Sequence, residues 1–119
     1  MFFSLQLWII VVKLCYEFLG GINMIKHIVC FKLSDSSEAS KNKAKEVLMS
    51  MVGNVPTIRS IEVGTDFLGS PRSYDVILQV ELDDRAALDE YQADKYHCDV
   101  VKTYMHANTV GSVAIDYDL

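Results

Sequence analysis

The sequence predicts an α+β domain in which helices cover one face of a four-stranded antiparallel sheet. Four segments alternate apolar and polar residues with the period of a strand, and two segments between them space their apolar residues as helices do. Their order along the chain is strand, helix, strand, strand, helix, strand. That order is typical of an antiparallel sheet with its helices on one side. We assign all of these elements to one domain, residues 24–119, an ordinary length for a single domain.

The first strand is predicted at residues 25–33, where apolar residues alternate with more polar ones. One histidine, His27, interrupts the apolar face. We expect this face to meet the helices, and it consists of Ile25, His27, Val29, Phe31 and Leu33.

The first helix is predicted to begin at Asp35, which stands three residues before Glu38 in the spacing of a capping box. Gly53 and Pro56 end it, because both residue types break helices. Its apolar stripe has spacings of three and four and consists of Ala44, Val47, Leu48, Met51 and Val52. A run of basic residues is assigned to its solvent-exposed side: Lys41, Lys43 and Lys45.

The second and third strands are predicted at residues 58–67 and 74–82, with a turn at residues 69–71 between them. The third strand has the clearest alternation in the chain. Its apolar face consists of Tyr74, Val76, Leu78, Val80 and Leu82.

The second helix is predicted in two pieces. Asp83 or Asp84 caps its start, and the helix breaks near Asp94. A short helix containing His97 follows the break. The last strand is predicted at residues 109–117, and one of its faces consists of Val113, Ile115 and Tyr117.

The predicted helices cover only one face of the sheet. No further helix is available to cover the other face, so a second copy of the same sheet is the economical cover. The sequence therefore predicts a homodimer in which two four-stranded sheets face each other as a barrel.

The composition argues against several kinds of site. The net charge is −5, and no cluster of Lys and Arg supplies the basic surface that nucleic acids require. The glycines form no phosphate-binding loop. His97, Cys98 and Asp99 are adjacent, and neighbouring residues do not usually converge on one metal ion. We therefore predict neither a metal nor a cofactor.

The three cysteines show no paired spacing, which fits a reducing compartment and predicts a cytoplasmic location.

Residues 1–23 form an apolar extension distinct from the domain. It lacks the basic start and the small-residue cleavage site of a secretory signal, and Lys13 and Glu17 interrupt it as a membrane span. A weak membrane anchor is one interpretation, and only then would a membrane be a partner. The other is a translated leader, with Met24 as the true start. The Gly20-Gly21 pair can be encoded by the purine-rich codons of a bacterial ribosome-binding site at the usual distance from Met24.

Several stretches of residues 24–119 resemble the stress-responsive A/B barrel domain family, called Dabb. They are residues 24–33, 55–58, 62–64, 73–92 and 114–117. The resemblance covers essentially the whole predicted domain. It implies a ferredoxin-like βαββαβ fold that pairs into a dimeric α/β barrel, and a cavity between the sheet and the helices.

The resemblance also implies candidate catalytic residues. A plant polyketide cyclase of this family uses a Tyr and a His from the broken helix, which correspond here to Tyr91 and His97, and its first-strand His corresponds to His27. The family's His-Pro pair between that Tyr and His is replaced here by Asp94-Lys95. A further cyclase histidine, on the third strand, corresponds to Val76. Both departures argue against the same chemistry.

Each candidate also has a structural interpretation. His97 as a base and Tyr91 as a hydrogen-bond donor would suit an aldol-type cyclisation, provided that the break in the helix brings them together. Alternatively, Tyr91 packs in the core with its hydroxyl at the rim, His97 caps the short helix, and His27 is a buried histidine bonded to a carbonyl or a Tyr hydroxyl. A second set is predicted to line an apolar cavity, or else to be ordinary core: Phe31, Met51, Tyr74, Leu78 and Tyr104.

Two functions follow from these residues. The first is a homodimer of unassigned activity with a cavity for a small apolar ligand. The second is a cofactor-independent cyclase or lyase that uses His97 as general base and Tyr91 as hydrogen-bond donor.

Overall fold

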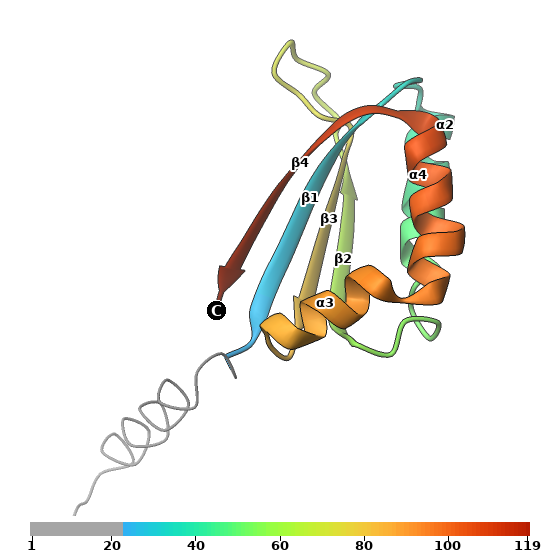
Figure 1. Cartoon of the computed structure of the whole chain (residues 1–119). Helices are drawn as coiled ribbons and strands as arrows, with labels where there is room; N and C mark the ends of the chain where they lie inside the picture. The colour runs from blue at the N-terminus through green and yellow to red at the C-terminus, as the bar shows by residue number, and fades with distance from the viewer. Residues whose placement is uncertain (1–22) are drawn as a thin grey trace, which may run out of the picture.

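The computed structural model describes residues 23–119, drawn in colour in Figure 1. The elements are β1 (Ile25–Leu33), α2 (Glu38–Met49), β2 (Ile58–Thr65), β3 (Val76–Leu82), α3 (Arg85–Ala93), the π-helix η1 (His97–Lys102), α4 (Thr103–Asn108) and β4 (Thr109–Asp118). Residues 1–22 lie outside the described residues, so the leader and the anchor both stay predictions. No helix within residues 23–119 is long and apolar enough to cross a membrane.

The four strands form one antiparallel sheet in the order β2-β3-β1-β4. β1 is central and pairs with both β3 and β4, and the helices lie along one face of the sheet (Figure 1). This is the ferredoxin-like arrangement, and the predicted α+β class and element order are confirmed. The predicted second strand is too long, because β2 ends at Thr65 and Phe67 is 94% exposed in the following loop.

The start of α2 differs from the prediction. Its N-cap is Ser37, whose hydroxyl accepts a hydrogen bond from the amide of Ser40 at 3.2 Å. Asp35 instead accepts a hydrogen bond from the amide of Ser37 and so shapes the turn before the helix. The far end also differs, since α2 ends at Met49 and Val52 is 58% exposed beyond it.

Lys41 was assigned to solvent from the sequence, and that assignment is wrong. It is buried at 7% exposure, and its Nζ donates to the carbonyl of Asp66 at 2.9 Å and to Glu38 Oε1 at 3.2 Å. The aliphatic stem of a lysine can cover apolar surface while its charged end finds partners. Lys41 thereby ties α2 to the chain just beyond β2, whereas Lys43 and Lys45 are exposed as predicted.

The core lies between the helices and the facing side of the sheet. Alternate residues of β3 are buried, as predicted for Val76, Leu78, Val80 and Leu82. Tyr74, predicted on the same face, lies before β3 and is exposed. The largest fully buried side chains come from both layers and are Tyr91, Leu48, Met51, Leu82, Val80 and Val101.

Within residues 23–119, no helix or strand covers the opposite face of the sheet. Directly paired residues of an antiparallel sheet share a face, and the register pairs Cys30 with both Ile77 and Val113. The same register adds Ile28, Ile115 and Tyr117 to this face. We call these six residues the open face. Its β4 members are 44–65% exposed, which is unusual for a contiguous set of large apolar side chains.

Candidate functional site

A cavity of about 250 Å³ lies between the helix-facing side of the sheet and the segment that contains α3, η1 and α4. Its lining combines an apolar set with every histidine of the chain. The lining residues are His27, Val29, Phe31, Leu48, Leu78, Tyr91, Gln92, His97, Val101, Lys102, Met105, His106, Ser112 and Ala114.

His27 reaches the cavity because side chains of a strand point alternately to its two faces, and His27 is on the face of β1 that meets the helices. It lies directly opposite Asp116 in the pairing of β1 with β4, so both side chains are on the same face. The two are hydrogen bonded, with His27 Nδ1 2.5 Å from Asp116 Oδ1. A carboxylate only accepts, so Nδ1 of His27 donates this hydrogen bond.

Tyr91 lies between the two buried histidines. Its ring centroid is 5.5 Å from that of His27 and 4.2 Å from that of His97. The side chain is completely buried, and its hydroxyl donates to Met51 Sδ at 3.7 Å rather than lying at the rim. Burial raises the pKa of the Tyr91 phenol, and the charge of Asp94 raises it further. Tyr91 is therefore a neutral hydrogen-bond donor at physiological pH.

His97 comes beside Tyr91 because the helix breaks at Asp94, whose backbone is extended. The Asp94 carboxylate accepts a hydrogen bond from the amide of His97 at 2.9 Å and restarts the helix there. His97 does not itself cap that start. Its Nδ1 instead donates to the carbonyl of Tyr91 at 2.8 Å, which leaves Nε2 as an acceptor.

The surroundings of His97 favour its neutral form. Burial lowers the pKa of His97, and the charges of Lys102 and His27 lower it as well, against the opposing effects of the Tyr91 carbonyl and Asp94. A neutral imidazole with an available Nε2 is the form that can accept a proton from a bound molecule.

This lowered pKa predicts a pH-dependent stability. Unfolded His97 takes up a proton near pH 6.5, whereas folded His97 does so only at lower pH. The unfolded state therefore binds more protons in this window, and acid favours it. We expect the free energy of unfolding, measured in urea, to fall as the pH falls from 7.5 to 5. The variant His97→Gln should show a shallower fall, and His106→Gln, on an exposed residue of α4, should keep the wild-type slope.

Two exposed carboxylates, Asp83 and Asp118, contribute little in that window. Hydrogen bonds from Arg59 and Arg85 lower the pKa of Asp83 and of Asp118, respectively, so both titrate below it. A wild-type slope in His97→Gln would contradict the assignment of the effect to His97.

The remaining predicted cavity residues are divided among three places. Phe31 and Leu78 line the cavity. Met51 lies behind Tyr91 and is fully buried, and Tyr104 packs at the edge of the core. Tyr74 lies at a different depression.

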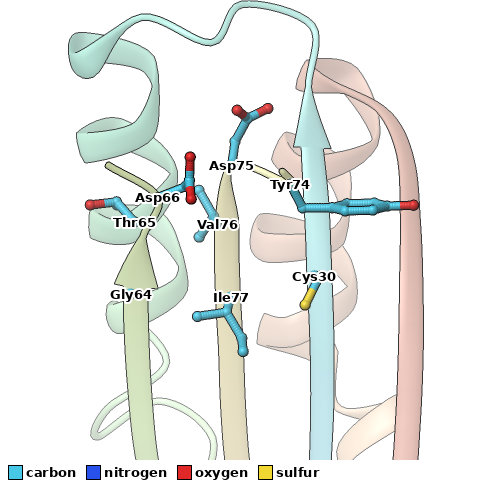
Figure 2. Close-up of a pocket in the computed structure, with 8 residues that line it drawn as sticks. All are labelled: Cys30, Gly64, Thr65, Asp66, Tyr74, Asp75, Val76 and Ile77. Carbon is cyan, nitrogen blue, oxygen red and sulfur yellow. The ribbon is translucent and has the colours of Figure 1, made fainter. Parts of the chain in front are cut away.

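That second depression, of about 300 Å³, is shown in Figure 2. Cys30, Ile77 and Gly64 form a row across β1, β3 and β2, with Tyr74 above them. The nearby Asp75 is buried and accepts hydrogen bonds from the amide of Leu33 at 2.7 Å and from the Ser36 hydroxyl. Since Cys30 and Ile77 belong to the open face, this depression is part of the surface that we expect a second subunit to cover.

Sequence reasoning missed several residues in and beside the first cavity. Asp116 interrupts an apolar strand pattern, and it would have been found as the partner of His27 if the β1–β4 register had been known. Lys102 and His106 were not predicted because their approach to the cavity depends on the π-helix. Within residues 23–119, no group of three or more His, Cys, Asp or Glu side chains is arranged to bind a metal ion.

Comparison with known proteins gives a consistent assignment. The family model described as "Stress responsive A/B Barrel Domain" matches residues 25–119. A comparison with curated proteins finds no match.

Among solved structures, a dimeric protein of unknown function with a ferredoxin-like fold from Bacteroides fragilis is 25% identical, with a TM-score of 0.68, covering 81% of this chain and 96% of that one. A Dabb family protein with a ferredoxin-like fold from Mesorhizobium loti is also 25% identical. Its TM-score is 0.61, and the match covers 82% of this chain and 97% of that one. The hydroxynitrile lyase of Passiflora edulis shares the fold at 14% identity. Its TM-score is 0.65, and the match covers 82% of this chain and 94% of that one.

Proposed function

Because the chain belongs to the stress responsive A/B barrel domain family, we propose that it acts as a homodimer whose subunits each bind a small apolar molecule beneath the helices. The observation that carries this proposal is the cavity of about 250 Å³ between the sheet and the broken helix. An apolar cavity of about 150 Å³ is enough to hold benzene. This cavity therefore has room for a substituted benzene or a short alkyl chain.

The dimer part of the proposal rests on the open face. Within the described residues, three of its six apolar residues are exposed and three are half-buried, and the B. fragilis protein is described as dimeric. The open face and the cavity lie on opposite sides of the sheet, so dimerisation leaves the cavity accessible. We also propose a cytoplasmic location, because Cys30 and Cys98 are free thiols.

Binding of 1-octanol, a neutral probe, tests the cavity. Ala114 lines it from β4 and is exposed, so Ala114→Phe should fill the mouth of the cavity without disturbing the core. We expect saturable binding in NMR titrations, with shifts at Leu78 and Val101, and at least about tenfold weaker binding in Ala114→Phe. Val52→Phe, on an exposed residue beyond α2, is the control and should bind as the wild type does. Shifts scattered over the surface, or unchanged binding in Ala114→Phe, would refute the cavity.

A cofactor-independent lyase or cyclase is the second candidate, and the orientation of His97 favours it. Because Nδ1 is bonded to the Tyr91 carbonyl, Nε2 is left to take a proton from a bound molecule. Among the described residues, the Tyr91 hydroxyl is engaged only by a thioether, a weak acceptor that a substrate carbonyl would outcompete. The proton removed would pass to Nε2, and the resulting enolate oxygen would accept the hydrogen bond from Tyr91.

This candidate predicts proton exchange in a bound ligand. The dimer, purified gently from its source and examined by native mass spectrometry, should carry a small molecule whose mass identifies it. In D₂O the wild type should then introduce deuterium next to the ligand's carbonyl. His97→Gln should still bind the ligand but exchange at least about a hundredfold more slowly, as expected for loss of a general base. Equal exchange rates in the two proteins would remove His97 from the chemistry.

A further inference from the structure

The cavity has an unusual charge for this chain. The protein has a net charge of −5, yet no acidic side chain is among the described residues that line the cavity. All three histidines of the chain and one lysine line it: His27, His97, His106 and Lys102. Basic groups are thus concentrated in this cavity between the helices and the sheet.

The π-helix places Lys102 beside His97. In an α-helix, residues five apart are rotated by about 140° from each other and point to different sides. In a π-helix the hydrogen bonds run between residues five apart, so His97 and Lys102 lie one above the other. Both residues consequently line the same cavity, and the charge of Lys102 contributes to the lowered pKa of His97.

Lys102 has no anionic partner among the described residues. Its Nζ donates to the carbonyl of Gln92 at 3.2 Å, and Gln92 also lines the cavity. Two carboxylates that contact the histidines of the site are already engaged. Asp116 accepts from His27, and Asp94 accepts from the amide of His97. The ammonium group of Lys102 is therefore available to a bound anion.

Most of the other residues that line the cavity are apolar. Leu48 comes from α2, Leu78 and Val29 from the sheet, and Val101 and Met105 from the segment that carries Lys102. Such a surface favours a hydrocarbon or an aromatic ring. The site thus combines an apolar floor with a cationic group, as the binding of an amphipathic anion requires.

We propose that the cavity takes a small apolar carboxylate, with its hydrocarbon part on the apolar floor and its carboxylate against Lys102 and His106. This inference rests on the proposed function, because it names the ligand class of the same cavity. The Lys102 ammonium supplies a charge-assisted hydrogen bond, and His106, exposed at the rim, supplies a second donor.

The test compares octanoate with 1-octanol, which has the same chain length and no charge, on the full-length protein. We expect octanoate to bind the wild type at least about tenfold more tightly, since a charge-assisted hydrogen bond has that effect. Lys102→Met, which keeps most of the apolar stem, should lose this preference for octanoate while binding 1-octanol as before. Retained octanol binding also shows that the variant is folded. Lys43→Met, on an exposed residue of α2, is the control and should keep the preference.

The outcomes separate the two proposals. Equal binding of octanoate and octanol to the wild type would overturn the carboxylate preference and leave the cavity in place. A preference that survives in both Lys102→Met and His106→Gln would also overturn it, because the anion would then lie elsewhere. Binding of neither probe would overturn this inference together with the proposed function.

Discussion

Replacing Ile115 by aspartate is expected to convert the proposed dimer into a monomer. Ile115 lies on β4 at the centre of the exposed apolar residues of the open face and is 65% exposed in the single chain. A two-fold dimer uses the same surface on both subunits, so each substitution occurs twice in the interface. Burying an unpaired carboxylate costs several kcal/mol, and two of them weaken association by about three orders of magnitude or more.

Sedimentation equilibrium measures this effect directly. The wild type should sediment as a dimer at micromolar concentration, and Ile115→Asp as a monomer with the same far-ultraviolet circular dichroism. Val52→Asp adds the same charge at an exposed site away from the sheet and should stay dimeric. A dimeric Ile115→Asp would show that the subunits pair through some other surface.

The second large effect is expected for Leu48→Ala. Leu48 has no exposed surface, lies on the inner side of α2, and contributes to both the core and the wall of the cavity. Truncating a buried leucine removes its transfer free energy and leaves a void, which together lower the free energy of unfolding by about 2–5 kcal/mol. In a domain of this size such a loss is a large part of the total stability.

Urea unfolding of Leu48→Ala should therefore show a lower midpoint with an unchanged slope. Val52→Ala, near the end of the same helix but exposed, should change the free energy by no more than about 0.5 kcal/mol. Because the truncation enlarges the cavity, saturating 1-octanol should restore part of the lost stability in Leu48→Ala. A loss below about 1 kcal/mol would mean that the surrounding side chains collapse into the space.

The fold was largely predictable because its signals are local. The alternation of β1 and β3 and the spacing of apolar residues in α2 depend only on neighbours in the sequence. The errors occurred where two segments meet. The sequence does not show that the carbonyl of Asp66 lies beside Lys41, so Lys41 was expected to be exposed. Ser37 and Asp35 are both common capping residue types, so the sequence could not decide between them.

The site was predictable only in part, for the same reason. The family resemblance pointed to Tyr91, His97 and His27, and the structure brings their three rings together. The pair of His27 with Asp116 spans 89 positions in the sequence and depends on the register of two strands. The spacing of apolar residues does not indicate the π-helix that turns Lys102 toward His97.

The position of β4 in the sheet has a consequence for synthesis of the protein. Of the four strands, β1 is translated first and lies inside the sheet between β3 and β4, but β4 is the last of the four to leave the ribosome. Until residues Thr109–Asp118 emerge, one edge of β1 has no partner, His27 lacks its carboxylate, and the cavity lacks the wall formed by Ser112 and Ala114. A nascent chain from which β4 has not yet emerged therefore has neither a finished sheet nor a binding site, and both form together once β4 has left the ribosome.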